Sequence, residues 1–145
     1  MINSFGFLIL RLCVGILLVH HGFEKLNDIE NFANAFVRPL HLPFPITLSY
    51  VAAFSEIAGS WMLITGLGVR LGALAIMGTM SVAIYHAISI NGFNIYLLEL
   101  LGLYWGGSIC LILNGGGMFS IDHLIRLSLG KTPKILRANL AHMGS

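Results

Sequence analysis

The sequence is poor in charged side chains. Only 10% of its 145 residues are Asp, Glu, Lys or Arg, whereas 57% are hydrophobic. A soluble domain carries roughly a quarter charged residues, so this chain could not cover a water-facing surface with polar groups. The net charge of +2 is too small, and the basic residues too scattered, to indicate a nucleic-acid partner. We therefore expect a single domain, residues 1–145, with the lipid bilayer as its main partner.

Cysteine and cofactor motifs are also scarce. Cys13 and Cys110 each stand alone in an apolar run without CxxC spacing, so we interpret both as small buried hydrophobes. The sequence contains no dinucleotide-binding fingerprint and no iron–sulfur spacing. Any electrons that the protein handles would therefore come from a partner or from a bound cofactor.

The first apolar run lacks the features of a cleaved leader. Residues 1–4 carry no basic side chain, Arg11 interrupts the run, and no small-x-small pattern precedes Gly22. We expect the run to be retained as a membrane span. The last four residues, His142 to Ser145, resemble a vector-derived tail, the alternative being a native end, and we assign them no function.

Four stretches approach the ~20 apolar residues that cross a bilayer as a helix. Short turns rich in glycine and asparagine separate the last three, and short connections make neighbouring helices antiparallel. The sequence therefore predicts an all-α, up-down, four-helix integral membrane bundle. The spans cover approximately residues 5–26, 46–67, 71–90 and 95–113.

The long connection between the first two spans, residues 27–45, has its own pattern. Apolar and polar side chains alternate at helical spacing in its first half, which is typical of an amphipathic helix lying on a membrane. Pro39, Pro43 and Pro45 then end this helix. After the fourth span, a glycine-rich turn leads to a C-terminal segment, residues 118–145, with a short helix that Ser120 caps.

Lysine and arginine near the span ends predict the orientation. The side that holds the N-terminus is richer in them than the far side, which holds Lys25 and Arg38. We expect both termini to be cytoplasmic, in a bacterial inner membrane or an equivalent membrane such as the thylakoid. The basic residues on the N-terminal side are Arg70, Arg126, Lys131, Lys134 and Arg137.

Ionisable side chains lie within all four apolar stretches. Placing such a group in hydrocarbon costs several kcal/mol, so a chain keeps it only with a partner or for a function. Because consecutive spans alternate in direction, these groups fall in the half of the bundle away from the termini. We predict a polar pocket in that half, formed by His20, His21, Glu24, Glu56, His86 and Glu99, with Tyr85 beside His86.

Within this pocket we assign proton-handling catalytic roles to Glu56, His86 and His20. The spacing also lets His20 meet Glu24, and His21 meet Lys25, on one helix face. The remaining predicted residues, which would bind a cofactor, are His21, Tyr85, Glu24 and Glu99. The alternative interpretation is that these groups only reach the headgroups or hydrogen-bond neighbouring helices. We assign no metal ligands.

A second polar cluster is predicted near the N-terminal side. Arg11 lies two turns into the first span, Arg70 opens the third, and Asp122 follows the glycine-rich turn. We predict a structural salt bridge between Arg11 and Asp122, with Arg70 nearby, because a buried pair chiefly fixes geometry. It would hold the C-terminal segment against the first helix.

Three segments of the chain, covering about residues 5–125, resemble the DoxX family of small four-helix membrane proteins. They are Arg11-Leu12-x-x-Gly15-x6-Gly22-x-x-Lys25-Leu26, then Glu56-x-x-Gly59 with Leu63-x-x-Gly66-x-x-x-Arg70-x-Gly72-Ala73, and Gly115-x-Gly117-x-x-Ser120-x-Asp122. The resemblance implies a link to quinone-linked redox metabolism, including a subunit of thiosulfate:quinone oxidoreductase, and to oxidative-stress complexes. His20, His21, Glu24, His86 and Glu99 stand outside the pattern.

Three functions remain open from the sequence. The first is a quinone-associated redox or accessory subunit, with a quinone in the polar pocket. The second is a non-enzymatic structural or assembly subunit that binds other membrane-protein subunits. The third, which we rank below these, is a bundle that binds haem through His86 and either His20 or His21, or that binds a metal at a site of histidine and glutamate side chains.

Overall fold

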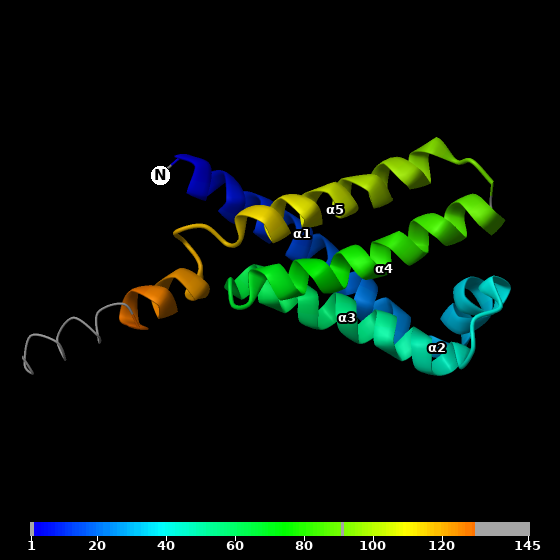
Figure 1. Ribbon diagram of the computed structural model, residues 1–145. Helices are drawn as coiled ribbons and strands as arrows, with labels where there is room; N and C mark the ends of the chain where they lie inside the picture. Colours follow the sequence, from blue (N-terminus) through cyan, green and yellow to red (C-terminus); the bar gives the residue numbers. More distant parts are fainter. Residues whose placement is uncertain (1, 91, 130–145) are drawn as a thin grey trace, which may run out of the picture.

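The structure is a computed structural model that describes residues 2–90 and 92–129, and within these residues it is helical and contains no strand (Figure 1). Its four long helices are each long and apolar enough to cross a membrane. They lie close to the predicted spans, so the predicted four-helix membrane bundle is confirmed. The helices are α1 (Ile2–Asn27), α3 (Pro45–Thr65), α4 (Val69–Ile90) and α5 (Ile95–Asn114).

The long helices pack in chain order. α1 packs against α3, α3 against α4, and α4 against α5, whereas α1 and α5 touch over a much smaller area. That smaller contact includes Gly107, where an added Cβ would meet Leu10 and Val14 in the first half of α1. Toward the other end α1 and α5 separate (Figure 1). We call the end with residues 27–45 and 92–94 the distal end, and the opposite end the proximal end.

Glycines let α1, α3 and α4 approach closely. A Cβ added to Gly22 would lie 2.6 Å from Cγ1 of Ile57, and one added to Gly59 would lie 2.9 Å from the carbonyl oxygen of Gly72. Small residues allow such backbone contact between helices in lipid. By contrast, a Cβ on Gly78 or Gly102 would meet nothing within 4 Å among the described residues.

The Gly59→Ala variant is expected to lower the thermal stability of the purified protein. Its new methyl group would meet backbone, which cannot move aside as a side chain can, and overpacking of this kind costs about 1–3 kcal/mol. Gly102→Ala makes the same chemical change in open space and serves as the matched control. Melting curves in one detergent compare the two; equal melting temperatures would contradict the close packing of α3 on α4.

The long connection folds as a short helical unit at the distal end. It contains α2 (Ile29–Phe32), a π-helical turn η1 (Ala33–Val37) and a 3₁₀ turn η2 (Arg38–Leu40). The carboxylate of Asp28 caps this unit by accepting a hydrogen bond from Asn31 N at 3.2 Å. The unit packs against α1 and α3, so the predicted helix also covers part of the bundle end.

Asp122 caps α4 from a distant part of the chain. Its carboxylate accepts hydrogen bonds from the backbone N–H groups of Gly68 at 2.7 Å and Val69 at 3.1 Å. A carboxylate at a helix N-terminus satisfies free N–H donors and interacts favourably with the helix dipole. The turn between α3 and α4, just before this cap, needs left-handed backbone at Gly66 and Gly68, which have φ values of 78° and 65°.

The buried Arg11 binds the glycine-rich turn instead of Asp122. Its guanidinium donates to the carbonyl oxygens of Gly116 at 3.1 Å and Phe119 at 2.9 Å. No salt bridge within 4.0 Å joins Arg11 to Asp122 in the described residues, so the predicted ion pair is wrong. The turn leaves carbonyl groups without helical partners, and Arg11 satisfies them. The C-terminal segment is still held against α1, as predicted.

Two further features complete the proximal end. Arg70 donates a hydrogen bond to the carbonyl oxygen of Leu113 at 3.2 Å. This carbonyl lies in the last turn of α5, where carbonyl groups have no partner within the helix. Residues 121–129 are helical, and Ser120 Oγ accepts from His123 N at 3.2 Å, which confirms the predicted cap. Cys13 and Cys110 were expected to be buried but are exposed on the outside of the bundle, so they face lipid.

Candidate functional site

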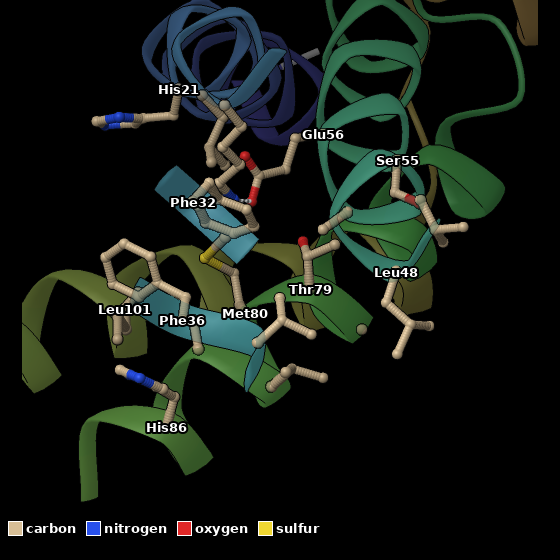
Figure 2. Close-up of a pocket in the computed structure, with 18 of the residues that line it drawn as sticks. His21, Phe32, Phe36, Leu48, Ser55, Glu56, Thr79, Met80, His86 and Leu101 are labelled. Carbon is tan, nitrogen blue, oxygen red and sulfur yellow. Dashed lines mark hydrogen bonds and ion pairs between the residues drawn. The ribbon is translucent and has the colours of Figure 1, made fainter. Parts of the chain in front are cut away.

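The distal half of the bundle contains a cavity of about 800 Å³. Side chains from α1, the α2–η2 unit, α3, α4 and α5 all line it, and Figure 2 shows part of this lining. Most of the lining is apolar. The cavity therefore matches the predicted location of the polar pocket, although hydrocarbon side chains make up most of its wall.

A buried ion pair between Lys25 and Glu56 forms part of this wall. Glu56 is completely buried, and its Oε1 accepts a hydrogen bond from Lys25 Nζ. Lys25 comes from the last turn of α1 and is 20% exposed. Its ammonium group also lies 5.0 Å from the centre of the Phe32 ring, a distance at which cation and ring attract. The buried carboxylate thus has its countercharge on another helix.

The sequence interpretation missed Lys25 as the partner of Glu56. It paired Lys25 with His21 and left Glu56 without a partner close in the sequence. In the structure His21 Nδ1 lies 3.1 Å from Glu24 Oε2, so the predicted pair of His21 with Lys25 is replaced, whereas His20 does lie near Glu24. One signal could have found the contact: Lys25 and Glu56 both belong to the pattern residues of the family resemblance.

Two buried polar atoms in the lining have no hydrogen-bond partner in the described part of the chain. They are Oε2 of Glu56 and Nε2 of His86. Most buried polar groups in proteins are hydrogen-bonded, so each exception calls for an explanation such as a ligand or an unseen water. Both atoms belong to residues that we predicted to be catalytic. Each of these two cavity-lining residues therefore has one buried polar atom whose hydrogen-bonding capacity is unused.

Aromatic rings connect these polar groups. Phe32 and Phe36 stack with ring centres 5.1 Å apart, and Phe36 packs on the ring of His86 at 5.2 Å. Figure 2 shows the two phenylalanines between Glu56 and His86. Lys25, Phe32, Phe36 and His86 thus form one continuous series of contacts along this wall of the cavity. The cavity thus has an aromatic side that comes from the α2–η2 unit.

The structure brings together only some of the predicted pocket residues. His21, Glu24, Glu56 and His86 line the cavity. His20, Tyr85 and Glu99 do not line it, and Tyr85 is 64% exposed. Adjacent residues on a helix point about 100° apart, so Tyr85 faces outward because His86 faces inward. We therefore remove His20, Tyr85 and Glu99 from the cavity.

The arrangement does not suit a haem held by two histidines. Such a haem needs two imidazoles facing each other across the ring. Phe36 packs against the ring of His86, and His20 lies outside the cavity lining. We therefore do not propose haem for this cavity.

Comparison with known proteins agrees with this architecture. The family model described as DoxX matches residues 6–89, which include α3 and both residues of the buried ion pair. An uncharacterized protein of Haemophilus influenzae is 33% identical over 134 residues, covering 86% of this chain and 85% of the relative. No solved structure matches. The chain is therefore an integral membrane protein that belongs to the DoxX family.

Proposed function

We propose that this protein binds a membrane quinone in the distal cavity, as a subunit of quinone-linked redox metabolism. The observation that carries the proposal is the pair of unpartnered buried atoms, Glu56 Oε2 and His86 Nε2, in a described lining that is otherwise largely apolar. Apolar walls with a few convergent polar groups are typical of ligand sites. A quinone, which is lipid-soluble and carries two polar oxygens, suits such a site.

The polar groups match both states of such a ligand. Quinone carbonyls accept hydrogen bonds, and the ammonium group of Lys25 and an N–H form of His86 Nε2 can donate them. Quinol hydroxyls donate, and Glu56 Oε2 can accept. A quinone supplies reversible two-electron, two-proton chemistry when bound. In this proposal Glu56 and His86 hold and exchange the protons, whereas the electrons come from a separate redox subunit.

The aromatic side of the cavity supports a flat ligand. Phe32 and Phe36 present ring surfaces next to the polar groups, and aromatic rings pack well against other planar rings. Because these residues belong to the α2–η2 unit, that unit would close over the ring of the quinone. The apolar lining from α4 and α5 would accommodate an isoprenoid tail.

Equilibrium binding of short-chain quinones to the purified protein tests the proposal. We expect saturable binding of a benzoquinone or a naphthoquinone analogue. The His86→Phe variant keeps a ring against Phe36 but removes both nitrogens. Loss of one hydrogen bond of about 1–1.5 kcal/mol should weaken binding about tenfold.

His123→Phe makes the same substitution outside the cavity lining and serves as the control. We expect it to bind quinone with unchanged affinity. Absence of saturable binding, or equal affinities for the His86→Phe and His123→Phe variants, would refute the proposed function. Melting temperatures of both variants check that the fold is intact.

A structural role in a larger complex is a second candidate function. α5 supports it, because only 11% of its spanning window is buried, compared with 28–33% in the other spans. Its outer face is therefore free to contact another membrane subunit. Quinone binding by the isolated protein separates the two functions, since an assembly subunit has no need of it.

We also propose that the proximal end faces the cytoplasm. Arg70 and Arg126 lie on that side, whereas Lys25, one of the two basic residues at the distal end, is neutralised by Glu56. Orientation follows the number of lysines and arginines near the span ends, and the proximal side holds more of them. In a variant without Cys13 and Cys110, His41→Cys should react with an impermeant maleimide in intact cells; reaction only after lysis would reverse the orientation.

A further inference from the structure

We propose that His20, His21 and Glu24 bind one divalent transition-metal ion at the distal end of α1. One ligand atom from each residue lies within 4.8 Å of the other two. The two imidazole rings are 4.0 Å apart between centres, and His21 Nδ1 lies 3.1 Å from Glu24 Oε2. Imidazole and carboxylate ligands suit Zn²⁺, Cu²⁺ and Ni²⁺.

The helix itself preforms this site. Glu24 follows His20 by four residues and His21 by three, so its carboxylate reaches both imidazoles on the surface of α1. α1 is continuous through Asn27, and the three ligands are therefore fixed by one helix without any long-range contact. Binding needs only side-chain rotations that replace the His21–Glu24 hydrogen bond with metal bonds.

The surroundings also favour a cation. The ammonium group nearest in sequence, Lys25, is neutralised by the buried Glu56. Asp28 and Glu30 follow in the sequence at the same end of the bundle and are exposed, and exposed carboxylates attract cations. In addition, neither ring nitrogen of His20 has a hydrogen-bond partner in the part of the chain that the structure describes. A metal ion would use one of these nitrogens.

The site has open coordination positions. Three protein ligands leave at least one position of a tetrahedral ion for water or another small ligand. His21 is only partly exposed and also lines the cavity, whereas His20 is exposed and lies outside its lining. The ion would therefore sit beside the cavity mouth and be reached from the distal aqueous side. The site uses neither Glu56 nor His86, which would bind the quinone oxygens, although His21 and Glu24 also line the cavity.

Titration of the purified, metal-free full-length protein with Zn²⁺ and with Cu²⁺ tests this site. We expect one ion per chain and, for Cu²⁺, an electron paramagnetic resonance spectrum with coupling to two nitrogens. The His20→Ala, His21→Ala and Glu24→Gln variants should each bind about tenfold or more weakly, because each removes one of three ligands.

The His41→Ala and His123→Ala variants serve as controls, since both histidines lie outside the cluster. We expect them to bind the ion like the parent protein. The proposal is overturned if binding does not saturate at one ion, if the three ligand variants match the parent, or if either control abolishes binding. Quinone affinity is measured on the same preparations, so intact quinone binding without metal binding overturns the metal site alone.

Discussion

The Lys25→Met variant is expected to lose about 3–5 kcal/mol of stability. Its apolar side chain is similar in length to lysine, so the change removes the charge and leaves the fully buried carboxylate of Glu56 without a countercharge. Breaking a buried pair from one side has a cost of this size because the remaining charge is neither solvated nor paired. Unfolding of the purified protein in mixed micelles with a denaturing detergent measures the loss.

A double variant shows whether the loss comes from the unpaired charge. Lys25→Met combined with Glu56→Leu replaces the pair by apolar side chains, and such replacements are often neutral or stabilising. The double variant should therefore recover most of the stability that Lys25→Met loses. Arg38→Met removes an exposed cation from the same end of the bundle and should change stability by less than about 0.5 kcal/mol. A double variant as unstable as Lys25→Met would show that the pair is not formed.

The Gly78→Phe variant is expected to weaken quinone binding by about 100-fold, or about 2.8 kcal/mol. Gly78 lines the cavity, and a Cβ at this position meets no described atom within 4 Å. The new ring therefore has room to enter the cavity without disturbing the helix contacts. It would occupy the space that the quinone needs, and stability should be nearly unchanged.

Gly102→Phe is the matched control for cavity filling. Gly102 also has open space at its Cβ but does not line the cavity. We expect this variant to bind quinone like the parent protein. If the two phenylalanine variants bind equally well, the ligand does not occupy this cavity. If both variants lose quinone binding, the loss cannot be attributed to filling of the cavity, because Gly102 does not line it.

The sequence predicted the membrane architecture well because hydrophobic length determines it. Each span needs about 20 apolar residues, and the turn at Gly66–Gly68 leaves little freedom in how α3 meets α4. Local chemistry was also predictable: Ser120 caps the C-terminal helix as expected. These features depend on residues that are close together in the sequence.

The contacts within the site could not be predicted in the same way. Lys25 and Glu56 are 31 residues apart, and their contact depends on how closely α1 and α3 pack at Gly22. Arg11 was expected to bind a carboxylate, but the glycine-rich turn offered it two carbonyl groups without helical partners. Tyr85 was misplaced because neighbours in sequence face different sides of a helix. In each case the outcome depends on helix rotation, which composition does not specify.

The aromatic side of the cavity was also beyond sequence reasoning. The first half of residues 27–45, which contains Phe32 and Phe36, was interpreted as an amphipathic helix lying on the membrane surface. The π-helical turn at Ala33–Val37 and its packing against α3 instead bring Phe36 to the ring of His86. π-Helical turns often occur at functional sites, and this one lies beside the distal cavity.

Photolabelling with a quinone that carries a photoreactive group on its ring tests the central claim most directly. Its attachment sites on the purified protein would be identified by mass spectrometry. The account predicts labels on cavity-lining residues of the α2–η2 unit and of α4, including Phe32, Phe36 and Ala83, and their loss in Gly78→Phe. Labels confined to outward-facing residues such as Leu103, and unchanged in Gly78→Phe, would contradict it.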